Sequence, residues 1–272
     1  MCRWLTYHGR PIFLEKLIME PVNSLIEQSL HARKAAVATN GDGFGVGWYG
    51  ERETPGIYRE ILPAWNDPNL RHLAHQIRSG LFFAHVRAST GTATSRANCH
   101  PFGHGRWLFM HNGQIGGYDR IRRRLDALLT DDLYACRQGT TDSELIFYLL
   151  FRFGLEDDPV AALAKTVETI NKAAADIEEE EPFKLTACLS DGRRVIAVRY
   201  SSDGVAPSLF ACQGEDHMIV VSEPLDAELA AWSEVPNNHI LIADGSCRMA
   251  VRPFREGDVR ARDSGRDSPS RL

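Results

Sequence analysis

Two strand-rich regions separated by helical segments are the feature that most restricts how this 272-residue chain can fold. Short apolar runs rich in β-branched or aromatic residues, bounded by glycine, proline or polar clusters, are typical of strands. In the first part of the chain they predict strands at residues 44–49, 57–62, 81–86 and 107–111. After Pro182 they predict strands at residues 184–189, 194–200, 208–211, 218–221, 240–243 and 249–251.

Helical spacing of apolar residues predicts helices between these regions, over residues 121–129, 142–153 and 160–177. Thr140 or Thr141 is a suitable cap for the second of these helices. The acidic run at residues 178–181 is interpreted as a solvated helix end rather than as a metal site. Between two strand-like runs, the pair Asp191-Gly192 is typical of a tight hairpin.

This order of elements predicts an α+β layered domain in which sheets pack face to face and helices lie outside them. The chain has no internal repeat and no interdomain linker, so residues 2–254 are interpreted as one domain. In residues 255–272, Arg and Asp alternate with Gly, Ser and Pro, which is a composition typical of a disordered tail.

The composition argues against several classes of function. The charges are mixed and their net value is −5, whereas nucleic acids and anionic membranes attract a concentrated basic patch. No run approaches the roughly 20 apolar residues of a membrane span, and the first residues lack the apolar segment of a secretory signal. We therefore expect a cytoplasmic protein with no nucleic acid and no membrane among its partners.

The six cysteines are widely spaced and form no CxxC pair, which gives little support to a zinc or dithiol site. Most are expected to be reduced thiols in the core, and no metal and no cofactor is predicted. Cys2 differs from the others because it directly follows the initiator methionine.

Cys2 is a candidate nucleophile. Removal of Met1, which is easy before a small residue, would give Cys2 a free α-amino group. The ordinary pKa of that group, about 7.7 to 8.0, suits it to accept the thiol proton. Nucleophile and base would then lie on one residue. Acylation of the near-terminal cysteine as a membrane tether is the alternative, but no second lipid signal or polybasic run accompanies it.

His111-Asn112-Gly113 follows a predicted strand and offers an oxyanion hole. The side-chain amide of Asn112 is a rigid donor, and Gly113 allows its N–H to approach a reacting carbonyl. The alternative is an ordinary hairpin turn, because Asn-Gly is common there.

Two charged residues could hold the ends of an amino-acid substrate. Arg87, at the end of another predicted strand, could bind a carboxylate through two parallel hydrogen bonds, or it could be a structural ion-pair partner. Asp142, at the start of a predicted helix, could accept a substrate ammonium, or it could only favour the helix N-terminus.

Five motifs occur together in a fixed order along the chain: Cys2, NGDGFGVGW at 40–48, HVRAST at 85–90, HNG at 111–113 and TTDSE at 140–144. With them the chain resembles the class II (N-terminal-nucleophile) glutamine amidotransferases, in particular the stand-alone members that begin Met-Cys-Arg. The segment VSEPL at 221–225 resembles a further element of the family core. The resemblance implies a four-layer αββα sandwich, with two mostly antiparallel sheets between helical layers.

The resemblance also implies roles for individual residues. Cys2 would attack the carboxamide of glutamine, and Asn112 and the Gly113 N–H would stabilise the oxyanion. Arg87 would bind the substrate carboxylate and Asp142 its ammonium. The glycine-rich segment 40–47 would lie near the site, as a packed turn rather than a calcium loop, because the EF-hand spacing of carboxylates is absent.

Three functions remain open at this point. The first is a glutaminase, either free or supplying ammonia to a separate synthetase chain, since no P-loop or sugar-binding segment follows the domain. The second is an amidase that removes a γ-glutamyl group from a larger amide, as in ergothioneine biosynthesis. The third is a non-catalytic binding protein on the same fold. The five site residues argue against the third.

Overall fold

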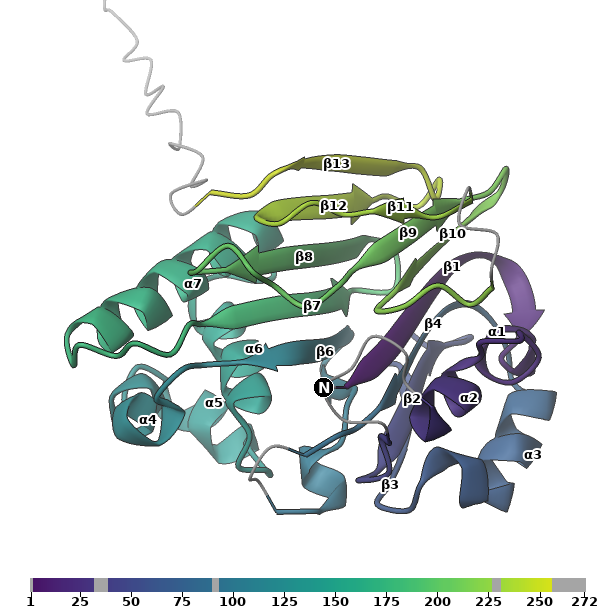
Figure 1. Ribbon diagram of the computed structural model, residues 1–272, viewed down its shortest axis with the longest axis horizontal. Coiled ribbons are helices and arrows are strands. Elements are labelled where there is room, and N and C mark those ends of the chain that lie inside the picture. Colours follow the sequence, from purple (N-terminus) through teal and green to yellow (C-terminus); the bar gives the residue numbers. More distant parts are fainter. Residues whose placement is uncertain (1, 32–38, 90–92, 227–230, 256–272) are drawn as a thin grey trace, which may run out of the picture.

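The computed structural model describes residues 2–31, 39–89, 93–226 and 231–255 (Figure 1). Met1 and nearly all of the segment predicted to be a disordered tail, residues 256–272, lie outside these ranges. No helix in the described ranges combines the length and the apolar character that crossing a membrane requires.

The strands form two sheets in which every pair of neighbours is antiparallel. The first sheet has seven strands, in the order β11 (Ser233–Glu234), β9 (Phe210–Gln213), β10 (His217–Val221), β1 (Arg3–Phe13), β4 (Arg78–Val86), β2 (Phe44–Tyr49) and β3 (Gly56–Glu60). The second has six, in the order β13 (Met249–Pro253), β12 (His239–Ala243), β8 (Val195–Ser201), β7 (Lys184–Ser190), β6 (Trp107–Gln114) and β5 (Phe102–His104).

The helices lie on the two outer sides of the paired sheets (Figure 1). Those next to the first sheet are α1 (Glu15–Ile18), α2 (Leu25–Leu30) and α3 (Pro68–Gln76). Those next to the second sheet are α4 (Tyr118–Asp126), α5 (Asp131–Cys136), α6 (Asp142–Arg152) and α7 (Pro159–Ala175). Two short 3₁₀ turns, at Ala64–Asn66 and Arg96–Asn98, complete the described elements.

The alternation of side chains along each strand separates three apolar cores. On β1, Leu5 and Tyr7 pack in the core beneath α1 to α3, whereas Trp4 packs between the sheets. On β6, Phe109 packs against α6 and α7, whereas Met110 faces the other sheet. These layers confirm the predicted four-layer αββα sandwich.

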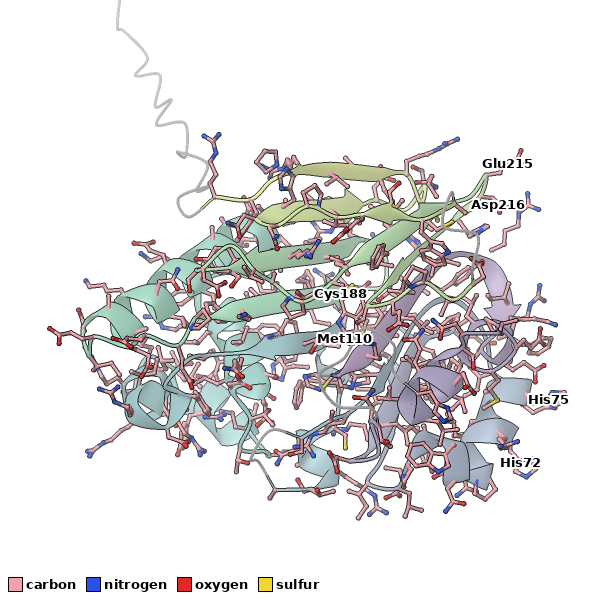
Figure 2. The ribbon with its side chains drawn as sticks, in the orientation of Figure 1. His72, His75, Met110, Cys188, Glu215 and Asp216 are labelled. Atoms are coloured by element: carbon pink, nitrogen blue, oxygen red, sulfur yellow. The ribbon has the colours of Figure 1, made fainter. Side chains whose placement is uncertain are left out.

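The middle of the molecule lies between the two sheets, where Figure 2 labels Met110 and Cys188 on the neighbouring strands β6 and β7. Cys188 also accepts a hydrogen bond from the hydroxyl of Thr6 on β1 at 3.3 Å, which joins the two sheets. This contact pairs two buried polar groups across the layer.

Most of the predicted elements are confirmed, with shifted ends. Thr141 caps α6, since its hydroxyl accepts a hydrogen bond from the Glu144 N–H at 3.2 Å. The Asp191 carboxylate closes the predicted hairpin between β7 and β8 by accepting main-chain hydrogen bonds from Arg193 and Arg194. The hairpin alternative for Asn112-Gly113 is wrong, because β6 continues through both residues to Gln114.

The patterns did not predict three of the strands, β1, β5 and β11, or four of the helices, α1 to α3 and α5. The first six residues of β1 are buried, and Arg3, Thr6 and His8 interrupt its apolar residues. A strand with buried polar side chains shows neither clean alternation nor an apolar run, so local patterns miss it.

Gly45 on β2 leaves room for the main chain of His100, in the segment before β5, to lie against the first sheet. A side-chain carbon at this position would overlap the His100 carbonyl oxygen and approach the Arg59 side chain to 2.9 Å. A backbone oxygen cannot move away cheaply, so we expect Gly45→Ala to lower the free energy of unfolding by about 1 to 3 kcal/mol. Urea unfolding measures this change.

The matched control is Gly50→Ala, because a side-chain carbon at Gly50 would have no heavy atom within 4 Å. We expect that control to stay within about 0.5 kcal/mol of the wild type. Equal stability of the two variants would contradict the proposed close packing at Gly45.

Candidate active site

Cys2 lies at the entrance to the space between the two sheets. It directly precedes β1, and the alternation that turns Trp4 between the sheets turns the Cys2 side chain the same way. The half-buried thiol donates a weak hydrogen bond to the Ala88 carbonyl at 3.6 Å. Burial raises the pKa of the Cys2 thiol, and the positive charges of Arg87 and Arg3 oppose that rise only in part. A raised pKa leaves the thiol protonated at neutral pH, so attack requires a base.

Asn112 approaches the same space from the second sheet. On β6 it follows the alternation of Leu108 and Met110, which face the first sheet. Its side chain is 3% exposed, and its Nδ2 has no hydrogen-bond partner in the described part of the chain. A buried donor without a partner is costly, which suits a donor whose acceptor arrives with a substrate.

The two sheets come together at this end of the molecule. β1 and β4 both contact β6. The His85 ring on β4 lies opposite Trp4 in the strand ladder, and its Nε2 is 3.4 Å from the His111 carbonyl oxygen. His111 immediately precedes Asn112, so the start of β1 and the end of β6 meet beside His85.

Gly113 adopts a backbone conformation that other residues avoid, with φ +154°. A side-chain carbon here would overlap the Lys184 carbonyl of β7. The local backbone therefore requires glycine at position 113. The role of its N–H as an oxyanion donor stays a prediction.

Arg87 is held at the end of β4 by the glycine-rich segment. Its guanidinium donates to the Asp42 carbonyl at 3.2 Å and to the Ser89 hydroxyl at 3.1 Å, and its side chain is buried. Asp42 in turn accepts the Ser89 N–H at 2.7 Å through its carboxylate. The segment that includes Asp42 thus orients the guanidinium at the predicted carboxylate-binding position.

Asp142 is the first residue of α6 and is tied to the end of β6. Its carboxylate accepts the N–H of Ile115 at 2.9 Å and that of Ser143 at 2.8 Å. Since Ile115 follows Gly113 by two residues, this half-buried carboxylate lies close to the predicted oxyanion hole. The Ser143 hydroxyl donates to the same carboxylate at 3.3 Å. A carboxylate has about four acceptor positions, so these three contacts leave capacity for one donor of an ammonium group.

Asn98 connects the two charged sides of the site, and the sequence patterns did not identify it. Its amide group accepts the Thr140 N–H at 2.8 Å and donates to the Ala93 carbonyl at 2.8 Å. Ala93 also accepts from Arg87 at 3.5 Å. No motif or spacing in the sequence indicates this link, because Thr140 is 42 positions from Asn98 in the chain.

The buried rings of His85, His100 and His111 lie behind the site, and those of His85 and His100 stack at 4.2 Å between centroids. Burial lowers the pKa of all three, to about 3 for His85. The His111 ring contacts the Ser143 hydroxyl at 2.9 Å. These rings are therefore neutral packing groups at physiological pH.

Met-Cys-Arg and VSEPL lie far apart in the sequence, and no local pattern pairs them. In the structure Arg3 and Glu223 form a buried ion pair with 3.2 Å between Nε and Oε2. The sequence offers one signal for such a pair: a charged residue of each sign lies in or beside a segment that is otherwise strand-like.

The described residues form no metal centre at this site. Across the described ranges, no three His, Cys, Asp or Glu side chains are grouped so that they could hold a metal ion. A cavity of about 420 Å³ lies between α4 and α7, and none of the predicted site residues lines it.

Comparison with known proteins identifies relatives over most of the chain. The family model described as glutamine amidotransferases class-II matches residues 18–206. A probable glutamine amidotransferase of Saccharomyces cerevisiae, DUG3, is 35% identical over 89% of this chain and 81% of its own length. A γ-glutamyl-hercynylcysteine sulfoxide hydrolase of Mycolicibacterium smegmatis is 28% identical over 89% of this chain and 95% of its own.

Solved structures agree with the fold. A glutamine aminotransferase class-II domain protein from Silicibacter pomeroyi is 38% identical with a TM-score of 0.73, covering 93% of this chain and all of its own. The glutamine phosphoribosylpyrophosphate amidotransferase of Bacillus subtilis has a TM-score of 0.65 over 93% of this chain and 49% of its own. At 15% identity, the latter likeness concerns the fold alone.

The buried His85 makes stability depend on pH. Below about pH 6.5 the unfolded chain takes up a proton on this histidine, whereas the folded protein does not until about pH 3. The free energy of unfolding therefore falls as the pH falls, by about 2 kcal/mol from this group between neutral pH and about pH 5. Urea unfolding at the two pH values should show a smaller loss for His85→Gln than for the wild type.

The exposed His72 on α3, labelled in Figure 2, provides the control. We expect His72→Gln to keep the pH dependence of the wild type. A His85→Gln variant that loses as much stability as the wild type on acidification would contradict the assignment.

Proposed function

The chain belongs to the class II glutamine amidotransferases, and on that basis we propose that it hydrolyses a γ-glutamyl amide through a thioester on Cys2. One observation carries the proposal: strand alternation turns the Cys2 thiol, beside Trp4, and the unpaired Nδ2 of Asn112, beyond Met110, toward the space between the sheets from opposite sides. The buried cation of Arg87 and the carboxylate of Asp142 flank that space.

The proposed reaction begins with removal of Met1, which frees the α-amino group of Cys2. That amine takes the thiol proton, and the thiolate attacks the carbonyl carbon of the γ-amide. Support for an internal base comes from burial of the thiol, which raises its pKa. Asn112 and the Gly113 N–H donate to the resulting oxyanion, and such donors are typically worth about 2.7 to 4 kcal/mol each.

Collapse of the tetrahedral intermediate breaks the carbon–nitrogen bond. The Cys2 ammonium returns its proton to the leaving nitrogen, which departs as ammonia or an amine. Water, deprotonated by the same amine, then attacks the γ-glutamyl thioester, and glutamate leaves as the thiol is restored. In both steps Arg87 binds the substrate α-carboxylate and Asp142 its α-ammonium, which aims the γ-carbonyl at Cys2.

Two leaving groups are supported by relatives. The yeast relative is named a probable glutamine amidotransferase, which favours ammonia from glutamine, released free or to a separate synthetase chain. The mycobacterial relatives are named γ-glutamyl-hercynylcysteine sulfoxide hydrolases, which favours a larger amine. The γ-glutamyl end would bind identically in both cases. Comparison of kcat/KM for glutamine with that for γ-glutamyl amides of larger amines distinguishes them.

Covalent labelling tests the nucleophile. We expect intact-mass spectrometry to find a chain without Met1, and 6-diazo-5-oxo-norleucine to add one adduct, mapped to Cys2. Cys2→Ser should take no label, whereas Cys136→Ser, at a half-buried thiol on α5, should label as the wild type does. A retained Met1, or a processed chain without an adduct, would contradict the proposed mechanism.

Replacement of Asn112 tests the oxyanion hole. Asn112→Leu keeps a side chain of similar size but removes the Nδ2 donor, so we expect kcat to fall by about 10² to 10³-fold. KM should change little, because the donor acts on the oxyanion rather than on the bound amide. Steady-state kinetics of glutamate release measures both, and an unchanged kcat would exclude Asn112 from the oxyanion hole.

A further inference from the structure

A nucleophile at the chain terminus needs support that an internal residue receives from its two neighbours. Chain ends are usually poorly ordered, whereas catalytic groups must be held within about 0.5 Å of their productive positions. The ladder between β1 and β4 begins at Arg3 opposite Val86, and the ladder with β10 begins at Leu5 opposite Val221. Cys2 therefore lies beyond the last paired residue of its own strand.

The side chain of Arg3 holds the main chain of Cys2 through a hydrogen bond. Its Nη1 donates to the Cys2 carbonyl oxygen at 2.9 Å, while its Nε donates to Glu223 Oε2 at 3.2 Å. Both charged side chains are almost fully buried, at 1% and 4% exposure. The guanidinium therefore connects the main chain of the proposed nucleophile to the segment that follows β10.

Glu223 is itself firmly held. Its second carboxylate oxygen lies 3.4 Å from the Asn23 amide nitrogen, and its carbonyl accepts the Gln28 amide at 3.3 Å. The preceding Ser222 makes two bonds to Trp4 of β1, from its N–H to the Trp4 carbonyl at 3.0 Å and from the Trp4 N–H to its hydroxyl at 3.2 Å. The acceptor for Arg3 is thus a rigid part of the core.

Arg3 is on the opposite face of the sheet from the thiol. It alternates with Leu5 and Tyr7, whose side chains face the helices, whereas Cys2 and Trp4 face the second sheet. A substrate between the sheets would not touch Arg3, so any effect of Arg3 must pass through Cys2. The orientation of the Cys2 carbonyl restricts rotation about its Cα–C bond, which sets where the amine and thiol point.

We propose that Arg3 and Glu223 are positioning residues that fix the main chain of Cys2, so that its freed amine and its thiol keep one orientation toward the substrate carbonyl. This inference rests on the proposed function. Arginine suits the task because its planar fork donates to two acceptors at once, whereas a lysine ammonium is a single point on a flexible stem. The pairing also explains why Met-Cys-Arg and Ser-Glu occur together in this chain.

The test compares Arg3→Lys and Glu223→Gln with the wild type in steady-state kinetics. We expect kcat to fall by about 10- to 100-fold, which is the size of effect that a small misplacement of a reacting group produces. KM should stay within about twofold, because substrate contacts are untouched. The rate of labelling by 6-diazo-5-oxo-norleucine should fall in parallel with kcat and still end at one adduct on Cys2.

A matched control comes from the exposed pair Arg124–Asp176, at 2.7 Å between α4 and α7. Arg124→Lys should leave kcat, KM and labelling unchanged. Should either buried variant fold poorly, Glu223→Asp keeps the charge at shorter reach, and the same loss of kcat without a change in KM is expected from it. Thermal unfolding of each variant identifies any that is not folded at the assay temperature.

Two outcomes would overturn the inference. Folded Arg3 or Glu223 variants with the kcat of the wild type would exclude a positioning role. So would variants in which KM rises by the same factor as kcat falls. A wild-type protein that takes no label would instead overturn the proposed function, and this inference with it. Labelling of the wild type therefore separates the two failures.

Discussion

The pairing of β1 with β4 on one side and β10 on the other is the constraint on which the rest of the structure depends. It pairs Arg3–Phe13 with Arg78–Val86, and the residues from Leu5 to Gly9 with those from His217 to Val221. Both faces of the first six residues of β1 are covered, by the α1 to α3 layer and by the second sheet. A strand fixed from four sides can hold a chain terminus at a defined position, which a surface strand could not do.

The layer between the sheets changes in character along its length. Near the centre it is apolar, and the Thr6 hydroxyl donates to the Cys188 sulfur across it. At the end where β1 begins and β6 finishes, charged and amide groups converge instead, and the Nδ2 of Asn112 has no partner among the described residues. A buried donor left unsatisfied is expensive, so an unpaired amide among converging polar groups is itself an indication of a binding site.

Gly45 and Gly113 lie in two of the sequence motifs and leave space for neighbouring backbone. Gly45 makes room for the backbone of His100, and Gly113 for the carbonyl of Lys184 on β7. Gly45 thereby allows the segment before β5 to lie directly against the first sheet, and that segment carries Asn98, which links Arg87 to the start of α6. The packing at Gly45 therefore helps to place the residues that orient the site.

The sequence alone determined the layered α+β class, most strands, the longer helices with a threonine cap at residue 140 or 141, and the ordered motifs containing Cys2, Arg87, Asn112, Gly113 and Asp142. These features are local, because alternation, helical spacing and turn residues act over a few neighbours. Only the tertiary structure revealed β1, the contacts of Asn98 and the pairing of Arg3 with Glu223, 220 positions apart. Buried polar residues satisfy their hydrogen bonds through partners distant in the chain, and no local pattern specifies which partner the fold will supply.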